Sequence, residues 1–423
     1  MDTVLHRRAV AQALSERLDE APVVRLSGPR AAGKTTTCVA EIERRGGTII
    51  RLDDPDERSA AMADPRGYLL GHAPPVLIDE YQRVPAALEV IKLELSRTAA
   101  AAGQWLLCGS VSVEAVTEAA ESLGGRLTDV VMGTLTVDER NDGPEPVFLA
   151  KVLEEGPASL RGWRPESKRG RDELLEEAVR GGFPLVTDRE TAAARRRGLT
   201  DWVNASVIAD SVSVGGVRDT ESLRRMLQLY AAATARITPK DRPTADRLEI
   251  DRRTVARYRD LLTALYVTWD LPAFVPGNAT GQVVRSPRLH MVDSGLAAAL
   301  AGRDQPDALS RDPQYAGALV ETMVVNDLRV QASAHPTTPR LLHFREDDDE
   351  VDLVIETDGG GVVGIEVKLT SSPGSRNLAG LRRLRRSSGK RWAGGLVLCR
   401  APAVRVTNDD LVIAPLEAVW DLH

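Results

Sequence analysis

The sequence contains few cysteines, no long apolar run and little excess charge. Its three cysteines, Cys38, Cys108 and Cys399, lie far apart and form no CxxC pair, which argues against a disulfide framework or a zinc ribbon and favours a reducing compartment. No stretch of about 18 uncharged apolar residues occurs. The first twenty residues carry charges throughout and lack the apolar block of a secretory signal. We therefore expect a cytoplasmic protein without membrane contact.

Length and net charge set further limits. The 423 residues are 43% hydrophobic and 27% charged, which excludes wholesale disorder and, at roughly 100 to 200 residues per domain, suggests two to four folded units. The 55 basic and 61 acidic residues give a net charge of −6, so nothing attracts a polyanion to the whole molecule. A surface that binds nucleic acid must therefore be local.

Apolar runs alternate with helical patterns in the first third of the chain. Strands are predicted at 23–26, 48–52, 76–78 and 105–108, and helices at 1–20, 35–45 and 85–100. This alternation is typical of an α/β fold with a parallel sheet covered on both faces. We expect this domain to occupy residues 1–137.

The pattern changes after residue 137. Helix-period segments predict a mainly helical region over 138–243. Residues 244–310 contain a helix that is basic early and apolar late, then a short extended run, an order that resembles a winged helix-turn-helix. Residues 311–423 return to mixed α/β character, with a helix at 316–330 and a hairpin formed by 350–356 and 362–369 around the glycines 359–361.

A phosphate-binding motif lies between the first predicted strand and the next helix. Residues 28–35 fit G-x-x-x-x-G-K-[ST] at every fixed position. The glycines let the backbone wrap around phosphates, Lys34 is expected to reach the β- and γ-phosphates of ATP, and Thr35 offers a hydroxyl to Mg²⁺. The expected nucleotide-binding residues are Gly28, Pro29, Arg30, Ala31, Ala32, Gly33, Lys34, Thr35 and Thr36.

Three later positions extend this site. The apolar run 76–78 ends in Asp79 and Glu80, which predicts a magnesium-binding carboxylate and a residue that orients the attacking water. Ser110 follows the next strand and is a candidate for a hydrogen bond to the water or the γ-phosphate; a plain strand-end turn is the alternative. Arg126 is a candidate arginine finger in the same chain or across a subunit interface, or simply a surface arginine.

The terminal hairpin carries a second constellation. Asp352, Glu366 and Lys368 lie in strictly alternating runs, and pairing across the hairpin would bring the two carboxylates together beside the ammonium. Such a group can hold a divalent cation and cleave a phosphodiester, with Glu321 as a fourth candidate ligand. The alternative is a hairpin with charged residues on its solvated face. We interpret the acidic run 346–350 mainly as a solvated loop, with a contribution to a second metal as the alternative.

Two groups of basic residues are candidate DNA contacts. The block from Val367 to Asn408 contains ten basic and no acidic residues, among them Arg382, Arg383, Arg385 and Arg386. Such a block is expected for a phosphate backbone, although a solvated helix or an acidic protein partner would also explain it. The second group consists of Arg252, Arg253, Arg257 and Arg259 on the basic helix of the winged-helix-like region.

The assembled motifs resemble a family, the prokaryotic AAA+ ATPases that carry a carboxyl-terminal domain of unknown function. The resemblance covers nearly the whole chain and depends on the motifs above together with 181–184, 286–288, 293–296, Gly317 and Glu321. It implies a P-loop ATPase domain, a winged-helix middle region and a terminal domain similar to the PD-(D/E)XK nuclease fold, whose pattern Asp352, Glu366 and Lys368 match. Many relatives of that fold bind without cleaving. Cys108 is a departure, because threonine or a similar polar residue is usual before Gly-Ser.

Two functions follow as alternatives. The first is an ATP- and Mg²⁺-dependent ATPase that acts on DNA, with a nuclease-like domain that cleaves or only binds. The second is a nucleotide-dependent switch or scaffold, in which the winged helix and the terminal domain contact protein. A homo-oligomer is a further expectation, and the sequence does not give its number.

Overall fold

The chain forms two compact units. The computed structural model describes residues 6–97, 101–110, 126–213, 215–277 and 285–423. One unit comprises Met1–Gly133 and Asp260–Val267, and the other comprises Thr134–Arg259 and Thr268–His423. The regions expected at 138–243, 244–310 and 311–423 thus lie almost wholly in the second unit. In the part of the chain that the structure describes, no helix is both long and apolar enough to cross a membrane.

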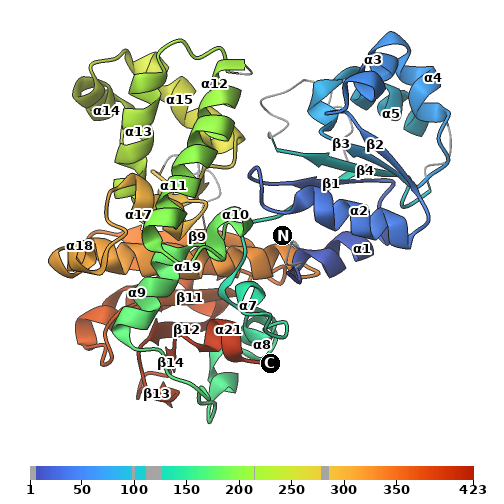
Figure 1. Cartoon of the computed structure of the whole chain (residues 1–423). Helices are drawn as coiled ribbons and strands as arrows, with labels where there is room; N and C mark the ends of the chain where they lie inside the picture. Colours follow the sequence, from blue (N-terminus) through green and yellow to red (C-terminus); the bar gives the residue numbers. More distant parts are fainter. Residues whose placement is uncertain (1–5, 98–100, 111–125, 214, 278–284) are drawn as a thin grey trace. The chain divides into compact units, whose positions relative to one another are not determined.

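The first unit is built on a parallel sheet of five strands in the order β2-β3-β4-β1-β5 (Figure 1). The strands are β1 (Val23–Ser27), β2 (Thr48–Arg51), β3 (Val76–Asp79), β4 (Trp105–Gly109) and β5 (Leu127–Val131). All residues of β3 and β4 are buried, as expected for central strands covered on both faces. The four predicted strands are confirmed, whereas β5 was not predicted because only Val130 of its five residues is fully buried.

Helices cover this sheet and begin where the sequence supplies caps. They are α1 (Val10–Glu20), α2 (Lys34–Arg44), α3 (Pro55–Ala63), α4 (Pro65–Leu70) and α5 (Ala86–Arg97). The carboxylates of Asp54 and Asp64 accept hydrogen bonds from the first-turn amides of α3 and α4, and a proline follows each of them. The three predicted helices correspond to α1, α2 and α5.

The strand register places the candidate residues at one edge of the sheet. Ser27 lies opposite Gly109, and Asp79 lies opposite Cys108. Because β1, β3 and β4 are parallel, the residues that follow them meet at the carboxyl edge of the sheet, where ligands of open α/β sheets bind.

The second unit opens with helices. They are α7 (Val137–Arg140), α8 (Phe148–Glu155), α9 (Arg171–Arg180), α10 (Pro184–Thr187), α11 (Ala192–Trp202), α12 (Ala209–Ser213), α13 (Thr220–Ala232), α14 (Asp241–Leu248) and α15 (Arg252–Ala264), whose residues from Asp260 onward are assigned to the first unit. A π-helical segment, Val203–Ile208, joins α11 to α12. The mainly helical region is therefore observed.

A small antiparallel sheet follows in the order β6-β8-β7. Its strands are β6 (Arg236–Ile237), β7 (Thr268–Leu271) and β8 (Arg288–Met291). Along the chain the elements run α13, β6, α14, α15, β7 and β8. After β8 come α17 (Ser294–Leu300), α18 (Pro306–Arg311) and the long α19 (Pro313–Ala334).

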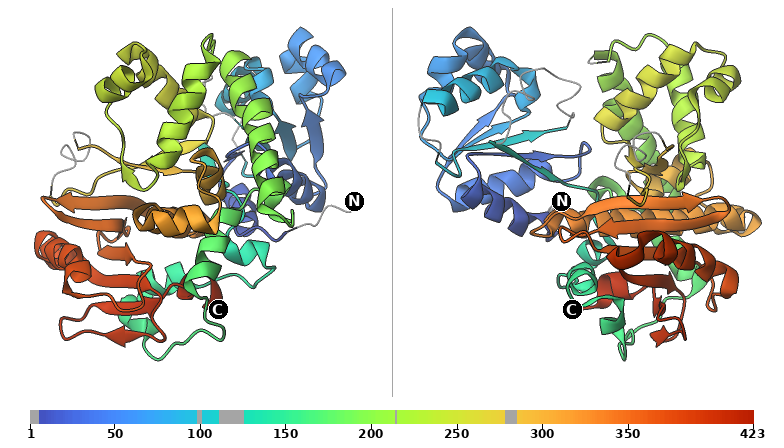
Figure 2. Two further views of the ribbon diagram at one scale, coloured as in Figure 1. Left: turned by 60° about the vertical axis from the view of Figure 1, so that its left-hand side comes forward. Right: turned by 180° about the vertical axis from the view of Figure 1, so that it is seen from behind.

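The terminal part, coloured orange to red in Figure 2, contains a mixed six-stranded sheet. The strand order is β13-β14-β12-β11-β10-β9. The strands of this sheet are β9 (Arg340–Glu346), β10 (Asp349–Glu356), β11 (Val362–Val367), β12 (Trp392–Cys399), β13 (Arg405–Val406) and β14 (Val412–Pro415). The helices of this part are α20 (Ala379–Ser388) and α21 (Ala418–Asp421). The hairpin of β10 and β11 is antiparallel, as predicted. The acidic run is a solvated turn only in part: Asp347 and Asp348 form the exposed turn between the two strands, whereas Glu346 ends β9 and Asp349 and Glu350 begin β10.

A buried joint holds the helices of the second unit together. The backbone amides of Gly182 and Leu296 donate to the carboxylate of Asp293 at 2.6 and 2.7 Å, and Thr134 Oγ1 adds a bond of 3.1 Å. Gly181 and Gly295 approach so closely that a Cβ on Gly295 would lie 2.8 Å from Gly181 Cα. These glycines and Asp293 therefore serve packing.

Candidate functional site

The phosphate-binding loop has a backbone that only glycine adopts at its fixed positions. Gly28 and Gly33 have φ values of +150° and +98°, in the region that L side chains rarely enter. A Cβ on Gly28 would lie 2.1 Å from Met132 O. The loop leads directly into α2, so its amides and the amino end of that helix face the same space.

Lys34 lies inside this loop. Its Nζ donates to the carbonyls of Gly28 and Pro29 at 2.9 and 2.8 Å, and burial lowers the pKa of the ammonium. The loop thus holds the lysine at the place expected for phosphate contacts, while Thr35 and Thr36 are exposed at the start of α2.

The two expected magnesium-binding groups lie side by side. Thr35 Oγ1 is 3.2 Å from Asp79 Oδ1, and Asp79 is buried at the end of β3. A hydroxyl and a carboxylate oxygen are the kind of ligand that Mg²⁺ prefers, and Mg²⁺ needs few of them because it keeps most of its waters. The oxygens of Thr35 and Asp79 therefore fit Mg²⁺.

The polar residues around this pair form a small network. Glu80 has φ +54°, and its carboxylate accepts a hydrogen bond from the side-chain amide of Gln82. Ser110 is buried beyond the end of β4, where Arg30 Nε lies 3.4 Å from its hydroxyl. The structure thus brings Glu80 and Ser110 to the carboxyl edge of the sheet.

Arg126 does not lie at this site in its own chain. It precedes β5, whose first residue Leu127 pairs with Val23 at the amino-terminal end of β1, and its guanidinium donates to Leu95 O at 3.1 Å. The phosphate-binding loop follows the opposite end of β1. Our expectation that Arg126 reaches a nucleotide in the same chain is therefore wrong, and an action across a subunit interface stays a prediction.

Two features of the loop's surroundings were not predicted. The buried Arg8 donates to the carbonyls of Ala32 and Gly133, the latter at 2.8 Å, and no sequence spacing identifies it. Beneath the loop, a hydrogen bond with Cys38 and burial raise the pKa of Cys108 well above its ordinary value. Cys108 thus packs against another thiol.

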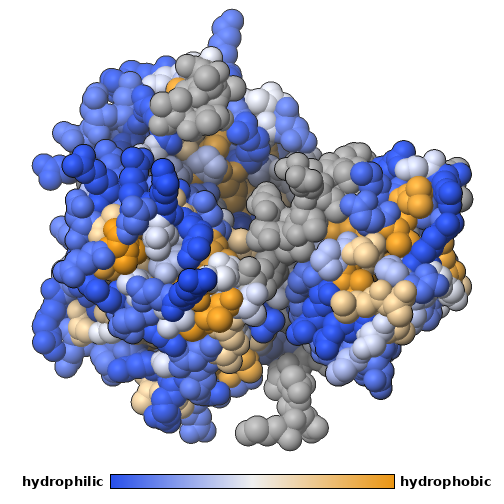
Figure 3. Space-filling view, turned by 90° about the horizontal axis from the view of Figure 1, so that it is seen from above, coloured by the Kyte–Doolittle hydropathy of each residue, from blue (hydrophilic) through white to orange (hydrophobic). Residues whose placement is uncertain are grey.

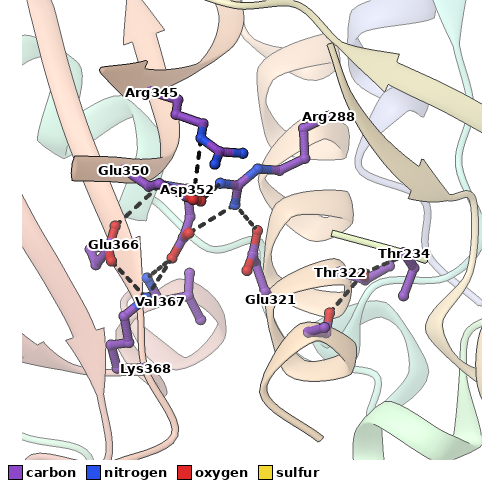
Figure 4. Close-up of polar contacts among 11 residues, drawn as sticks. Thr234, Arg288, Glu321, Thr322, Arg345, Glu350, Asp352, Glu366, Val367 and Lys368 are labelled. Atoms are coloured by element: carbon purple, nitrogen blue, oxygen red, sulfur yellow. Dashed lines mark hydrogen bonds and ion pairs between the residues drawn. The ribbon is translucent and has the colours of Figure 1, made fainter. Parts of the chain in front are cut away.

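A second polar cluster lies at the end of the terminal hairpin. Asp352 N donates to Glu366 Oε2 at 3.2 Å, and Val367 N donates to Asp352 Oδ2 at 2.9 Å. Lys368 Nζ lies 2.6 Å from Glu366 Oε1 and 3.1 Å from Asp352 Oδ2 (Figure 4). The two carboxylates and the ammonium therefore meet, as the alternation predicted.

The surroundings of this cluster differ from the expectation. Every residue of β11 is buried, and both α19 and α20 contact this strand. The alternative of a solvated charged face is therefore excluded. The carboxylates are instead enclosed, and enclosed carboxylates need compensating charge.

Arg288 supplies much of that charge and was not predicted. Its Nη1 lies 2.6 Å from Glu321 Oε1 and 2.9 Å from Asp352 Oδ1, and its Nη2 lies 2.7 Å from Glu350 Oε2 (Figure 4). Glu321 thus joins the cluster through an arginine. In the described part of the chain, no group of three or more His, Cys, Asp or Glu residues is placed to hold a metal ion.

Burial and these charges set the protonation of the cluster. Burial, with Asp352 nearby, raises the pKa of Glu366 to about 8 and that of Glu321 to about 7. Burial acts on Asp352 in the same direction, but Lys368 and Arg288 hold its pKa below the ordinary value. Asp352 is therefore charged at neutral pH.

The two groups of arginines differ in exposure. Arg252, Arg253 and Arg257 are exposed on α15, whereas Arg259 pairs with Asp241. On α20, Arg382 pairs with Asp409, Arg383 pairs with Glu346, and Arg385 donates to Asp409 O; of the four described arginines of this helix, only Arg386 lacks such a bond. Three of the four arginines of α20 therefore have partners within the chain, and a DNA contact by the basic block stays a prediction. The face viewed in Figure 3 is mostly hydrophilic, with small separate apolar groups.

Three domain families match the chain in order. An AAA domain matches residues 20–141, a domain of unknown function (DUF8612) matches 171–307, and another (DUF4143) matches 316–419. The first match covers the parallel sheet and its phosphate-binding loop. The expectation of an AAA-type ATPase is confirmed.

Solved structures give weaker similarities. The Walker-type ATPase PABY2304 of Pyrococcus abyssi is 13% identical with a TM-score of 0.43, over 70% of this chain and 96% of its own. A RuvB variant of Thermotoga maritima is 16% identical with a TM-score of 0.29, over 62% of this chain and 89% of its own. Similarities of this size carry no argument about this chain.

Curated relatives are closer in sequence. "Uncharacterized protein Mb2031c" of Mycobacterium bovis and "Uncharacterized protein Rv2008c" of Mycobacterium tuberculosis are each 31% identical over 376 residues, which is 88% of this chain and 75% of the relative. The AAA domain lies at the amino-terminal side of this chain. The similarity to the two relatives covers this chain well beyond that domain. The chain therefore belongs to the family of Mb2031c and Rv2008c.

Proposed function

We propose that this protein hydrolyses ATP with Mg²⁺ and uses the nucleotide cycle to act on DNA. The observation that carries the first part is the contact between Thr35 and Asp79 beside the glycine-framed loop, 3.2 Å between oxygens. The loop amides and Lys34 bind the phosphates, and Thr35 and Asp79 hold the ion. Bound there, Mg²⁺ neutralises charge that develops on the phosphates.

Glu80 has a separate role in this proposal. Its carboxylate lies one residue beyond Asp79 and is held by Gln82, so it can orient a water and accept its proton. Binding and hydrolysis thus depend on different residues. Lys34 serves phosphate binding and charge stabilisation, and Glu80 serves only the attack of water.

The DNA part of the proposal depends on the elements around α15. The order α13, β6, α14, α15, β7, β8 with sheet order β6-β8-β7 supports the proposal of a winged helix in this region. Arg252, Arg253 and Arg257 are exposed on the third helix of this set. Guanidinium groups on such a helix suit contacts with phosphates and base edges.

For the terminal domain we propose a nuclease-like fold that binds without cleaving. The residue types of Asp352, Glu366 and Lys368 are those of a metal-dependent nuclease, yet Arg288 and Lys368 already pair with the carboxylates. DNA incubated with the protein and Mg²⁺ or Mn²⁺ should stay intact. Nicking that Asp352→Ala abolishes would replace this proposal with a cleaving enzyme.

The test of ATP hydrolysis is phosphate release by three proteins. The wild type should turn over, and Lys34→Ala should lose roughly 100-fold or more, since the removed charge stabilises the transition state. Lys168→Ala, which removes an exposed lysine of the second unit, is the matched control. Equal background release by the wild type and Lys34→Ala would end the proposal.

A scaffold that contacts proteins remains the second candidate. The pairing of Arg382 and Arg383 within the chain favours it, because a phosphate would compete with Asp409 and Glu346 for these guanidinium groups. Affinity for duplex DNA measured at several salt concentrations separates the candidates. If the protein binds DNA, the logarithm of the binding constant should fall with the logarithm of the salt concentration with a slope of about −0.9 per phosphate contact. Weak, salt-insensitive binding supports the scaffold.

A further inference from the structure

A buried arginine lies next to the phosphate-binding loop, and the proposed function gives it no role. Arg8 is 8% exposed and lies just before α1, where Ala11 N donates to Arg8 O at 3.0 Å. Helix α1 contacts β1, β5 and α2 (Figure 1). Since β1 precedes the loop and α2 follows it, Arg8 is held by a helix that packs against both elements flanking the loop.

The guanidinium of Arg8 connects the loop to the sheet. Its Nη1 donates to Ala32 O, and its Nη2 donates to Gly133 O at 2.8 Å. Just before Gly133, Met132 N donates to Ser27 O at 2.8 Å, which continues the parallel pairing of β1 with β5. The planar guanidinium suits two acceptors at once. Arg8 therefore fastens the middle of the loop to a point fixed by the sheet.

The bond to Ala32 O sets the direction of the next amide. The peptide bond between Ala32 and Gly33 is trans, and in a planar trans peptide the carbonyl and the N–H point in opposite directions. Because the carbonyl is directed to Arg8, the N–H of Gly33 is directed away from it. A positive charge on the carbonyl also polarises the peptide, which makes its N–H a stronger donor.

Lys34 does not do the same task. Its ammonium has three N–H groups, and it donates to the carbonyls of Gly28 and Pro29 at the start of the loop. One N–H is left for a phosphate, so Lys34 must release a carbonyl to reach a second phosphate oxygen. The bonds of Arg8 lie on backbone carbonyls of Ala32 and Gly133 and are compatible with a bound nucleotide.

We propose that Arg8 is a positioning residue of the nucleotide site, which orients the peptide between Ala32 and Gly33 so that the Gly33 amide binds a phosphate of ADP or ATP. The inference rests on nucleotide binding in the proposed function and does not depend on hydrolysis or on DNA. The amide binds phosphate in the substrate complex and in the transition state alike. Loss of Arg8 should therefore raise KM for ATP and leave kcat unchanged.

The test measures the Kd of the full-length protein for ADP with Mg²⁺ by isothermal titration calorimetry. Arg8→Met should raise this Kd about tenfold or more, the loss expected for hydrogen bonds from a charged group. Arg17→Met is the matched control, because Arg17 lies on α1 and pairs with Glu20, and it should keep the wild-type Kd.

Steady-state ATP hydrolysis separates positioning from a purely structural role. Arg8→Met should raise KM for ATP by the same factor as the Kd for ADP, with kcat within about twofold of the wild type. A protein that is only less completely folded would show a lower kcat at an unchanged KM. That second pattern would contradict the positioning role.

A second variant guards against failure to fold. Arg8→Met leaves two backbone carbonyls without their donor and is expected to melt at a lower temperature than the wild type. Arg8→Lys keeps a positive charge without the planar pair of N–H groups, and its Kd for ADP should be at least about threefold above that of the wild type. If Arg8→Met does not fold, this value decides the test.

The outcomes distinguish this inference from the proposed function. Wild-type Kd values in the folded Arg8 variants, with normal ATP binding by the wild type, would overturn the positioning role alone. No binding of ADP or ATP by the wild type would overturn both.

Discussion

Gly182 has no room for a side chain, which gives a prediction at the scale of one residue. A Cβ there would lie 2.0 Å from Leu135 O, and that carbonyl belongs to the backbone and cannot turn away. Gly182→Ala should lower the free energy of unfolding by about 1–3 kcal/mol, the usual cost of overpacking. Gly317→Ala is the control, because nothing lies within 4 Å of its Cβ on α19 and alanine favours helix. Urea unfolding that shows equal stability for both variants would contradict the close packing of Gly182 in the buried joint around Asp293.

The buried carboxyl of Glu366 gives a pH dependence. Its folded pKa of about 8 lies above its ordinary value of 4.5, so between these values the folded state holds a proton that the unfolded state has released. Stability should therefore be greatest at low pH in this window and fall as pH rises through it, by at most about 1.4 kcal/mol per pH unit for one group.

The measurement is the free energy of unfolding of the wild type and Glu366→Gln from pH 5 to pH 8. The variant should show a flatter profile, because an amide does not titrate. Glu155→Gln, at a side chain that is 54% exposed, should keep the wild-type slope. Parallel profiles for wild type and Glu366→Gln would contradict the raised pKa.

At the scale of elements, α15 and α20 carry arginines with different surroundings. Replacing Arg252, Arg253 and Arg257 together by alanine should weaken duplex binding and reduce the salt slope by about 0.9 for each phosphate that is no longer neutralised. The double variant Arg382→Ala/Arg383→Ala is the matched control, because both arginines pair within the chain. Fluorescence anisotropy at four salt concentrations gives both quantities. Equal losses for the two sets would remove α15 from its proposed role.

Local sequence patterns predicted the strands of the first unit well where burial is uniform along the strand. The apolar runs gave β1, β3 and β4, and the spacing of Gly28, Gly33 and Lys34 gave the phosphate-binding loop. Strand β5 was not predicted because only Val130 of its five residues is fully buried, so its sequence lacks an apolar run. The helix α20 was predicted as a free basic surface because its partners Asp409 and Glu346 lie 27 and 37 residues from their arginines.

The terminal site shows the same limit at longer range. The hairpin register brought Asp352 to Glu366, which lie 14 residues apart, and the two-residue period was enough to predict that. Arg288 lies 33 residues from Glu321 and 64 from Asp352, and only the packing of three elements brings it there. The charge balance of the site was thus beyond any local pattern.

At the scale of the whole molecule, the proposed function requires that the nucleotide at Lys34 changes the affinity for DNA at α15. Coupling between two sites is reciprocal, so a nucleotide that tightens DNA binding must itself bind more tightly to the DNA complex by the same factor, typically 5- to 150-fold. We expect affinity for DNA to differ by at least five-fold between ATP and ADP.

The experiment is a DNA titration with ATP, with ADP and without nucleotide, each at two salt concentrations. Glu80→Gln should bind ATP and hold the ATP-state affinity over time, because it lacks the group that orients water. Lys34→Ala should bind DNA with the nucleotide-free affinity under all three conditions, which shows that the change arises at the phosphate-binding loop. One affinity in all three states of the wild type, with normal ATP turnover, would leave two units that work independently, and the ATPase would then not drive action on DNA.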